Sequence, residues 1–430
     1  MRQSALVLLL PAILAPRLQD PPPQAPLAWE TLEARMDAET KAGFSGAVLV
    51  VRGGKIVLDR GYGLANREEK IEATKDTIFA IGSTPIDFTK AGILLLIQDK
   101  KLSLDETLPA FFENVPEDKR AITVGHLMTG RSGLRDFHDV PTDRDPDHSW
   151  IDRSEAVKRI LAQELLFEPG KGQEHSHSAW GLLAAILEIK SGKSYPEFTR
   201  ERLFAPAGMK DTGFFGEPIP KERLAIGYGE RKDGETNAPP SWGKTSWLVM
   251  GSGGMVSTTG DLHRWNTAMR AGRILSKQSA EMYFGPVGAV FDGGDMYGFE
   301  ILYTEGPDNL FFLVSNSVDR ASRERFEKLG EDLVGLVQGK AARRFGLGVE
   351  FAVQSTGEAT SIVVKRVLPG RAAERDGLRA DDVLIAIGGE PVGENAMAVL
   401  APYLESGKAI PFTVKRGNER IEITVKPDPR

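Results

Sequence analysis

The chain of 430 residues contains no cysteine. Disulfides, thiolate metal sites, cysteine nucleophiles and a lipidated N-terminal cysteine are therefore all excluded. The fold must draw its stability from apolar cores, and 41% hydrophobic against 27% charged residues is a normal globular balance. A chain of this length and composition can bury at least one sizeable core and is long enough for two.

The charge balance excludes one class of partner. There are 60 acidic and 54 basic residues, a formal net charge of -6, and no long basic run. We therefore expect no nucleic-acid partner. No nucleotide-binding glycine loop or cofactor motif is present in the sequence either, so we predict no cofactor.

The N-terminal sequence has the pattern of a targeting segment. Arg2 precedes an apolar stretch over residues 5–15, which is typical of a secretory signal and shorter than the roughly 20 residues of a membrane span. We predict a signal peptide at 1–19, a stiff proline-rich linker at 20–26 and a periplasmic or secreted body. The alternative is an uncleaved N-terminal anchor, with no transmembrane helix beyond that segment.

Apolar spacing predicts the elements of the body. A helix is expected over 27–42, followed by two strands, 46–51 and 55–59, joined by a hairpin turn. A mostly buried helix should run over 83–100. Further helices are predicted at 154–165, 178–192, 194–204, 260–272 and 320–337. The runs 297–303 and 310–315 predict an antiparallel hairpin.

Several strings, in order, carry a resemblance over most of residues 40–270. They are FSGAVLVVRGGKIVLDRGYGLANRE, TIFAIGS, FTKAGILLLIQDKKLSLDETL, ITVGHLMTGRSGL, FEPGKGQ and GSGGMVSTTGDLHRW. This pattern resembles the serine β-lactamase and penicillin-binding-protein family, in its class C and esterase-like branch. The resemblance implies an α+β fold over 27–338, with an antiparallel sheet flanked by helices. Function has to be judged separately, from the site.

The resemblance places the family nucleophile at Ser83, where a lysine three residues later should take its proton. Ile86 occupies that lysine position and has no proton to exchange, so the Ser-x-x-Lys motif is broken. Lys90 returns to the same helical face, but two turns of rise separate it from Ser83 by about 10 Å. We regard Lys90 as a weak substitute.

The second family motif, Tyr-x-Asn, aligns with His175 and His177. An imidazole beside Ser83 would form a Ser–His dyad suited to neutral pH, and we name His175 as the candidate base, with His177 as a further site residue. No orienting carboxylate can be identified from the sequence. Alternatively, the pair could bind a metal with Glu174 or with Asp136, His138 or His148 from the preceding loop, but His-x-His alone is a weak signal and we predict no metal.

The third family motif is a Lys-Thr-Gly or His-x-Gly strand that faces the nucleophile. No such string lies between the predicted strands 297–303 and 310–315, and the region looks shortened by two strands. Thr304-Glu305-Gly306 is a faint relic candidate. Loss of this strand would remove half of the oxyanion hole and a group that binds the substrate carboxylate.

Residues 342–430 resemble a PDZ domain in its bacterial strand order, on the strings RRFGLGVEF, SIVVKRVLPGRAAERDGLRADDVLIAIGGEPV and FTVKRGNERIEITVKP. The resemblance implies that the loop Phe345, Gly346, Leu347 and Gly348 receives a peptide carboxylate, and that the edge strand beginning at Val349 adds a peptide strand. The alternative is a PDZ-shaped spacer that binds no peptide.

Two functions follow from these observations. The favoured one is a bacterial pseudoenzyme with a degenerate site, acting as a binding or regulatory module whose PDZ domain recruits a protein C-terminus or an extended peptide. The alternative is an atypical serine hydrolase, an esterase, peptidase or β-lactamase-like enzyme, that uses Ser83 with His175 as base on cell-wall peptide or a small ester or amide. A purely structural role at the envelope cannot be separated from the first by sequence.

Overall fold

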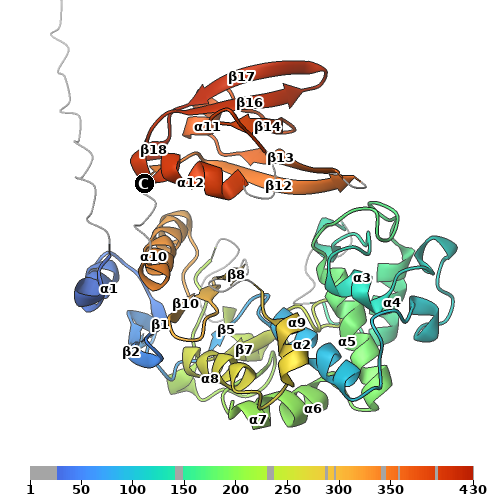
Figure 1. Ribbon diagram of the computed structural model, residues 1–430. Coiled ribbons are helices and arrows are strands. Elements are labelled where there is room, and N and C mark those ends of the chain that lie inside the picture. The colour runs from blue at the N-terminus through green and yellow to red at the C-terminus, as the bar shows by residue number, and fades with distance from the viewer. Residues whose placement is uncertain are drawn as a thin grey trace, which may run out of the picture.

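The computed structural model describes residues 27–140, 149–229, 237–285, 289–294, 297–339, 345–356, 359–392 and 396–429. The predicted signal peptide, 1–19, and linker, 20–26, lie outside the described residues. Figure 1 follows the chain from the helices and sheet of the N-terminal domain to a separate group of C-terminal strands. Within the described part of the chain, no helix combines the length and apolarity of a membrane span.

A five-stranded antiparallel sheet organises the first domain, in the order β2-β1-β10-β9-β8. Its strands are β1 (Gly46–Arg52), β2 (Lys55–Tyr62), β8 (Val290–Gly294), β9 (Glu300–Thr304) and β10 (Leu310–Ser315). β1 pairs with β10 from Gly46↔Ser315 to Val51↔Leu310, and both strands are almost entirely buried. Their near-continuous apolar runs are explained by this position, because a strand covered on both faces has no solvent-facing residues.

Alternate residues of the central strands enter two different cores. Val48 and Val50 pack with Phe311 and Leu313 beneath helices α1 (Leu32–Lys41) and α10 (Arg320–Gln338). Leu49 and its neighbours enter the larger core formed with the remaining helices. The period of two along a strand thus divides one apolar run between two layers, which explains why the run shows no alternation.

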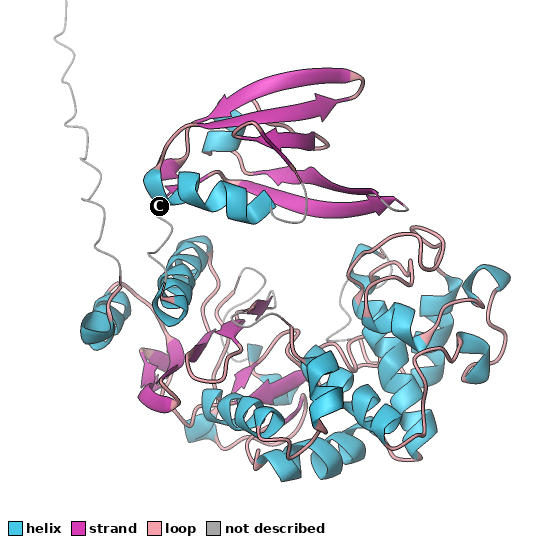
Figure 2. Ribbon diagram, in the orientation of Figure 1, coloured by secondary structure: helices cyan, strands magenta, loops and turns pink. Residues whose placement is uncertain are grey.

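Each helix predicted for the larger core is found close to its range, and two short helices, 124–128 and 277–283, were not predicted. The helices of this core are α2 (Pro85–Gln98), α3 (Val124–Met128), α4 (Arg153–Ala162), α5 (His177–Ser191), α6 (Tyr195–Thr199), α7 (Ala205–Ala207), α8 (Thr259–Arg270) and α9 (Lys277–Tyr283). The predicted helix 194–204 is divided, because a π-helical turn at Arg200–Phe204 separates α6 from α7. Figure 2 shows these helices apart from α1 and α10, which cover the other face of the sheet.

Short strands and 3-10 turns complete the domain around this core. The short strands are β3 (Leu64–Asn66) with β4 (Ile71–Glu72), and β5 (Phe79–Ala80) with β7 (Met255–Ser257) and β6 (Gly213–Phe214). The 3-10 turns are η1 (Trp29–Thr31), η2 (Leu108–Ala110), η3 (Glu117–Lys119), η4 (Phe137–Asp139), η7 (Lys221–Arg223) and η9 (Pro239–Trp242). Strand β5 leads directly into the turn that carries Ser83.

The late region is not shortened as the sequence suggested. Strand β8 lies before Tyr297, upstream of the interval in which a third-motif strand was expected, and it pairs with β9 from Val290↔Thr304 to Gly294↔Glu300. It forms an edge of the sheet. The strand was missed because it is short and contains two glycines, so it shows neither β-branched enrichment nor alternation.

The C-terminal module has its own six-stranded sheet and its own apolar core. Its elements are β11 (Phe345–Gly346), β12 (Val349–Thr356), β13 (Ala359–Val367), α11 (Ala372–Arg375), β14 (Val383–Ile387), β15 (Glu390–Pro391), α12 (Ala396–Ser406), β16 (Ile410–Arg416), β17 (Glu419–Val425) and β18 (Asp428–Pro429). The core forms around Val364, Leu384, Phe412 and Val414. Figure 1 shows the two helices beside the sheet.

Candidate active site

Ser83 lies in the turn between β5 and α2. Gly82 adopts a φ of 50°, and a Cβ at this residue would lie 2.6 Å from the backbone N of Gly294. Glycine meets both demands because it lacks the side chain that would clash. Pro85 is the first residue of α2, where its missing N–H leaves no hydrogen bond unmade. Ser83 is half-buried at the positive end of the α2 dipole.

His177 is the residue that contacts the Ser83 hydroxyl. It is the first residue of α5, whose N-terminus is capped by Ser176. Its Nε2 lies 3.0 Å from Ser83 Oγ, which is hydrogen-bond distance. The start of α5 therefore places the His177 imidazole beside Ser83, which precedes α2 and lies 94 residues earlier in the sequence.

Asp136 fixes the orientation of that imidazole. Its Oδ2 lies 2.7 Å from His177 Nδ1 and accepts a second hydrogen bond, of 2.9 Å, from the His177 backbone N–H. An ionised carboxylate can only accept, so the His177 Nδ1 carries the proton and Nε2 presents a lone pair to Ser83. Ser83, His177 and Asp136 thus form one continuous chain of hydrogen bonds.

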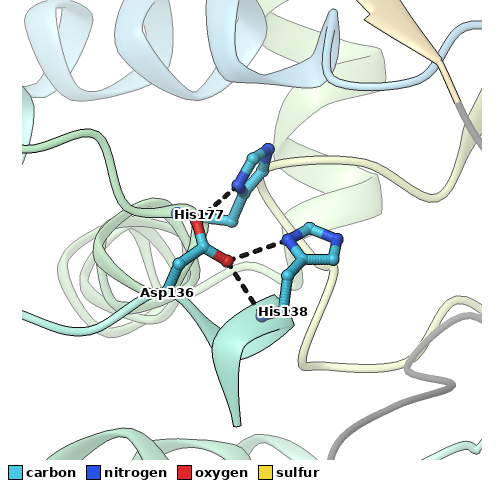
Figure 3. Close-up of side chains that lie close together, drawn as sticks. All are labelled: Asp136, His138 and His177. Atoms are coloured by element: carbon cyan, nitrogen blue, oxygen red, sulfur yellow. Dashed lines mark hydrogen bonds and ion pairs between the residues drawn. The ribbon is translucent and has the colours of Figure 1, made fainter. Parts of the chain in front are cut away.

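Asp136 itself is held by a second histidine. Its Oδ1 accepts hydrogen bonds from the His138 backbone N–H at 2.9 Å and from His138 Nδ1 at 2.8 Å. Burial raises the pKa of Asp136, but the hydrogen bonds from His138 and His177 outweigh it and hold this pKa well below its ordinary value. The carboxylate is therefore ionised throughout the neutral range. Figure 3 shows both rings directed at the carboxylate.

The structure separates the two histidines of the predicted motif. His175 is exposed, and its ring meets the ring of His177 edge-on, with centroids 4.8 Å apart and planes at 89°. Among the described residues, it makes no hydrogen bond to Ser83. The sequence analysis named His175 as the candidate base, whereas the imidazole that contacts the Ser83 hydroxyl is that of His177, two residues later.

The side chains of Ile86 and Lys90 make their contacts away from the Ser83 hydroxyl. Ile86 packs against the large apolar core, as a hydrocarbon side chain should. The Lys90 ammonium donates to the backbone carbonyl of Tyr283 at 2.7 Å and lies over the ring of that tyrosine. In the described part of the chain, the Lys90 ammonium is therefore bound to Tyr283 and not to Ser83.

Glu305, the relic suggested for the third motif, lies elsewhere. It is 6% exposed, and burial, together with the charge of Asp87, raises its pKa to about 8. The strand beside Ser83 is β8, since a Cβ on Gly293 would lie 2.9 Å from the Ser83 backbone N. The segment Phe291-Asp292-Gly293 keeps the glycine of a His-x-Gly string, with phenylalanine in place of histidine.

A cavity of about 50 Å³ opens over Ser83. Its walls include the apolar side chains of Phe137, Phe215 and Val249, together with His138 and His177. No lysine or arginine occurs among the described residues that line it. The cavity is therefore small, its walls combine apolar and polar groups, and the described part of its lining offers no permanent cation to bind a substrate carboxylate.

The predicted peptide-binding residues of the C-terminal module lie where a peptide strand could be added. β11 pairs through Phe345 and Gly346 with β18, and Leu347 is buried. Gly348 takes a φ of 68°, and Val349 begins β12. Within the described residues β12 pairs on one side only, with β13, so its other edge has backbone groups available for an added strand.

The comparisons with known proteins agree with this architecture. The family model described as Beta-lactamase matches residues 30–309, and the model described as PDZ domain matches residues 336–401. The chain therefore belongs to the beta-lactamase family and carries a PDZ domain after it. The predicted α+β fold, an antiparallel sheet flanked by helices and followed by a PDZ domain, is confirmed.

Named relatives include penicillin-binding proteins and a peptidase. Penicillin-binding protein 4* of Bacillus subtilis (strain 168) is 30% identical over 280 residues, which are 62% of this chain and 61% of that protein. The D-aminopeptidase of Brucella anthropi is 29% identical over 242 residues, 54% of this chain and 43% of that enzyme. The chain thus spans less than two thirds of the length of either relative.

A solved structure supports the fold. The penicillin-binding protein from Bacillus halodurans superposes with a TM-score of 0.58 at 22% identity, over 69% of this chain and 99% of that chain. At this identity the likeness concerns the fold alone. The chemistry of the site has to be derived from this chain's own residues.

Sequence reasoning named Ser83 and, as a further site residue, His177, but it did not name Asp136 as the carboxylate that orients the imidazole. Asp136 was considered only as a possible metal ligand, because nothing in the local spacing connects it to His177, 41 residues later. The two backbone segments that meet at Gly82 and Gly293 were not recognised either. The glycine in each segment was the available sign of a close backbone approach, but the sequence did not show which two segments approach each other.

Proposed function

We propose that this protein is an extracytoplasmic serine hydrolase in which Ser83 is the nucleophile, His177 the general base and Asp136 the orienting carboxylate. The observation that carries the proposal is the continuous hydrogen-bond chain from Ser83 Oγ through His177 to Asp136. The same order of nucleophile, base and orienting group recurs on unrelated folds and is recognised by geometry. A degenerate binding module, which the sequence favoured, does not account for this alignment.

The proposed reaction needs no lysine at residue 86. His177 Nε2 takes the proton of the Ser83 hydroxyl while Oγ attacks the acyl carbon. His177 then returns the proton to the leaving group, and an acyl-enzyme forms. A water molecule, deprotonated by the same nitrogen, attacks the acyl-enzyme; the bond between the acyl carbon and Oγ breaks, His177 returns the proton to Ser83 Oγ, and the carboxylic acid is released.

The developing oxyanion needs donors on the opposite side of the acyl carbon. The backbone N–H of Ser83 has no backbone acceptor among the described residues, and it lies at the N-terminus of α2. The backbone of β8 approaches it at Gly293 and Gly294. We assign the oxyanion hole to the Ser83 N–H and this strand, since removal of one such donor typically costs about 10²–10³ in kcat.

The cavity supports a particular acyl group. A volume of about 50 Å³ accommodates only a few heavy atoms, since one water needs about 10–15 Å³ by this measure. Without a permanent cation in the described lining, a carboxylate on the acyl side would be buried without a partner. We propose short, uncharged acyl esters as the substrates, in preference to penicillins or carboxylate-bearing peptides.

The proposed nucleophile is tested by covalent labelling. Folded wild-type protein and Ser83→Ala would be treated with a fluorophosphonate probe and analysed by intact mass and peptide mapping. We expect one adduct per chain, on Ser83, and none in the variant. Folded wild-type protein that stays unlabelled at saturating probe would contradict the proposal and return the degenerate module to first place.

The same preparations test the substrate class. p-Nitrophenyl acetate should be hydrolysed by wild-type protein, whereas a fluorescent penicillin should leave no adduct on Ser83. A stable penicillin adduct on a labelled, folded enzyme would retain the hydrolase assignment and overturn the short-acyl assignment.

We propose that the PDZ domain binds a protein C-terminus, and that the protein acts in the periplasm or outside the cell. The unpaired edge of β12 supports peptide addition, and the apolar segment at 5–15 supports export. In this binding mode main-chain hydrogen bonds give affinity, and backbone N–H groups hold the terminal carboxylate. The spacer interpretation predicts no such binding.

The carboxylate requirement gives a direct test of the PDZ proposal. A library of C-terminal peptides would be screened against the full chain by fluorescence polarisation, and each binder resynthesised with an amidated C-terminus. We expect amidation to weaken binding at least tenfold, because a charge-assisted set of hydrogen bonds is lost. Equal binding of acid and amide, or a library without binders, would favour the spacer.

A further inference from the structure

Asp136, His138 and His177 form a cluster whose composition suits a metal ion as well as a catalytic triad. We call it the imidazole–carboxylate cluster. One ligand atom from each residue lies within 4.8 Å of the other two. Figure 3 shows the rings converging on the carboxylate from two elements, η4 and the start of α5. Two imidazole nitrogens and one carboxylate oxygen are a ligand set that zinc accepts, with one position left open.

The spacing of the cluster is close to what zinc requires. Zn–N and Zn–O bonds of about 2.1 Å around a tetrahedral centre place ligand atoms about 3.4 Å apart. The Nδ1 atoms of His138 and His177 lie 2.8 and 2.7 Å from the two oxygens of Asp136. The largest separation between ligand atoms of the cluster is 4.8 Å or less, so an ion between them requires side-chain shifts of about 1 Å, which lengthen the two N–O separations and shorten the largest one.

An ion can reach the cluster from solvent. The His138 side chain is 55% exposed, and His138 and His177 both line the cavity over Ser83. The donor types also suit a divalent ion, because carboxylate oxygens and neutral imidazole nitrogens are metal-binding groups. Access and donor type therefore agree.

Binding at this cluster would change the state of the catalytic histidine. In the triad, His177 Nδ1 holds the proton and Nε2 accepts from Ser83. A metal on Nδ1 takes the lone pair there, so the single proton of the neutral ring moves to Nε2. Nε2–H is a donor only, and it cannot remove the proton from the Ser83 hydroxyl.

We propose that the imidazole–carboxylate cluster is a site for zinc or a chemically similar divalent transition metal, and that metal occupancy and the catalytic arrangement of His177 exclude each other. The binding half of this inference stands on the cluster alone. The inhibitory half rests on the proposed hydrolase function. A free metal concentration above the dissociation constant would then switch the enzyme off reversibly.

Metal binding is measured without reference to activity. Chelator-treated full-length protein would be titrated with zinc in competition with a chromophoric chelator. We expect one tight equivalent per chain, at least tenfold weaker in His138→Ala and in His177→Ala, and unchanged in His263→Ala, whose histidine lies on α8 outside the cluster. Absence of a tight equivalent, or tight binding that survives His138→Ala, would overturn the site.

Inhibition is measured on p-nitrophenyl acetate with wild-type protein and His138→Ala, each normalised to its own metal-free rate. Zinc should inhibit the wild type at the concentration at which it binds, excess chelator should restore the rate, and His138→Ala should need at least tenfold more zinc. Tight binding to a fully active enzyme would overturn the exclusion. A protein that binds zinc but never hydrolyses the ester would contradict the proposed function and leave the metal site standing.

Discussion

Replacing His177 with alanine should lower kcat/KM on p-nitrophenyl acetate by at least about 10³-fold, whereas His175→Ala should stay within a few-fold of wild type. The large effect follows from the 3.0 Å contact of His177 Nε2 with Ser83 Oγ, because without that base the serine hydroxyl is a weak nucleophile at neutral pH. His175 meets only the edge of the His177 ring. Its loss removes packing from an exposed surface.

The two variants control for each other, since each removes one imidazole from the same three-residue segment. Thermal unfolding of both should establish that the proteins are folded before the rates are compared. Fluorophosphonate labelling of His177→Ala should slow in parallel with turnover, because both reactions need the activated serine. Loss of activity in His175→Ala with His177→Ala intact would return the base to the residue that the sequence suggested.

Most of the first domain could be predicted because the local sequence of each element indicates its type. The hairpin of β1 and β2, the buried helix α2 and the closing helix α10 have apolar spacing that decides their type without reference to the rest of the chain. The register around Ser83 was equally local, since Pro85 suits the first turn of a helix and the flanking strings repeat a known pattern. These features lie within about 20 residues of sequence.

The pairing of Ser83, His177 and Asp136 could not be predicted in the same way. His175 and His177 differ by two residues, and only the start of α5, set by the cap at Ser176, decides which ring meets the serine. Asp136 reaches His177 from a separate loop. Long-range contacts of this kind depend on tertiary packing, which local spacing does not encode.

Strand β8 illustrates a different limit. Two of its five residues are glycines, which lowers its strand propensity, and a Cβ on one of them, Gly293, would lie 2.9 Å from the Ser83 backbone N. The strand exists because β9 offers it an edge. A search for a Lys-Thr-Gly or His-x-Gly string therefore failed at the residues where the backbone of that motif persists, and this apparent loss was one of the three that favoured a pseudoenzyme in the sequence analysis.

The hydrogen bonds of Asp136 make Asp136→Asn the most informative single replacement. We expect kcat to fall by about 10³–10⁴ with little change in KM. The asparagine amide can turn an N–H toward His177 Nδ1, which would leave the ring proton on Nε2, facing Ser83. The serine then meets a donor where it needs an acceptor. A kcat within about threefold of wild type would show that Asp136 is not the orienting group.

The same replacement carries a stability signature with a defined sign. The pKa of Asp136 is held below its ordinary value, so the folded state binds fewer protons than the unfolded chain, and the carboxylate contributes stability above its unfolded pKa of about 3.9. That contribution disappears as the pH falls through the lower, folded pKa. Asp136→Asn should therefore unfold at a lower temperature than wild type at pH 7, with the difference shrinking as the pH is lowered below about 4. The kcat measurement and the unfolding series are made on the same protein. A loss of activity that exceeds the loss of folded protein is therefore caused by the changed tautomer of His177.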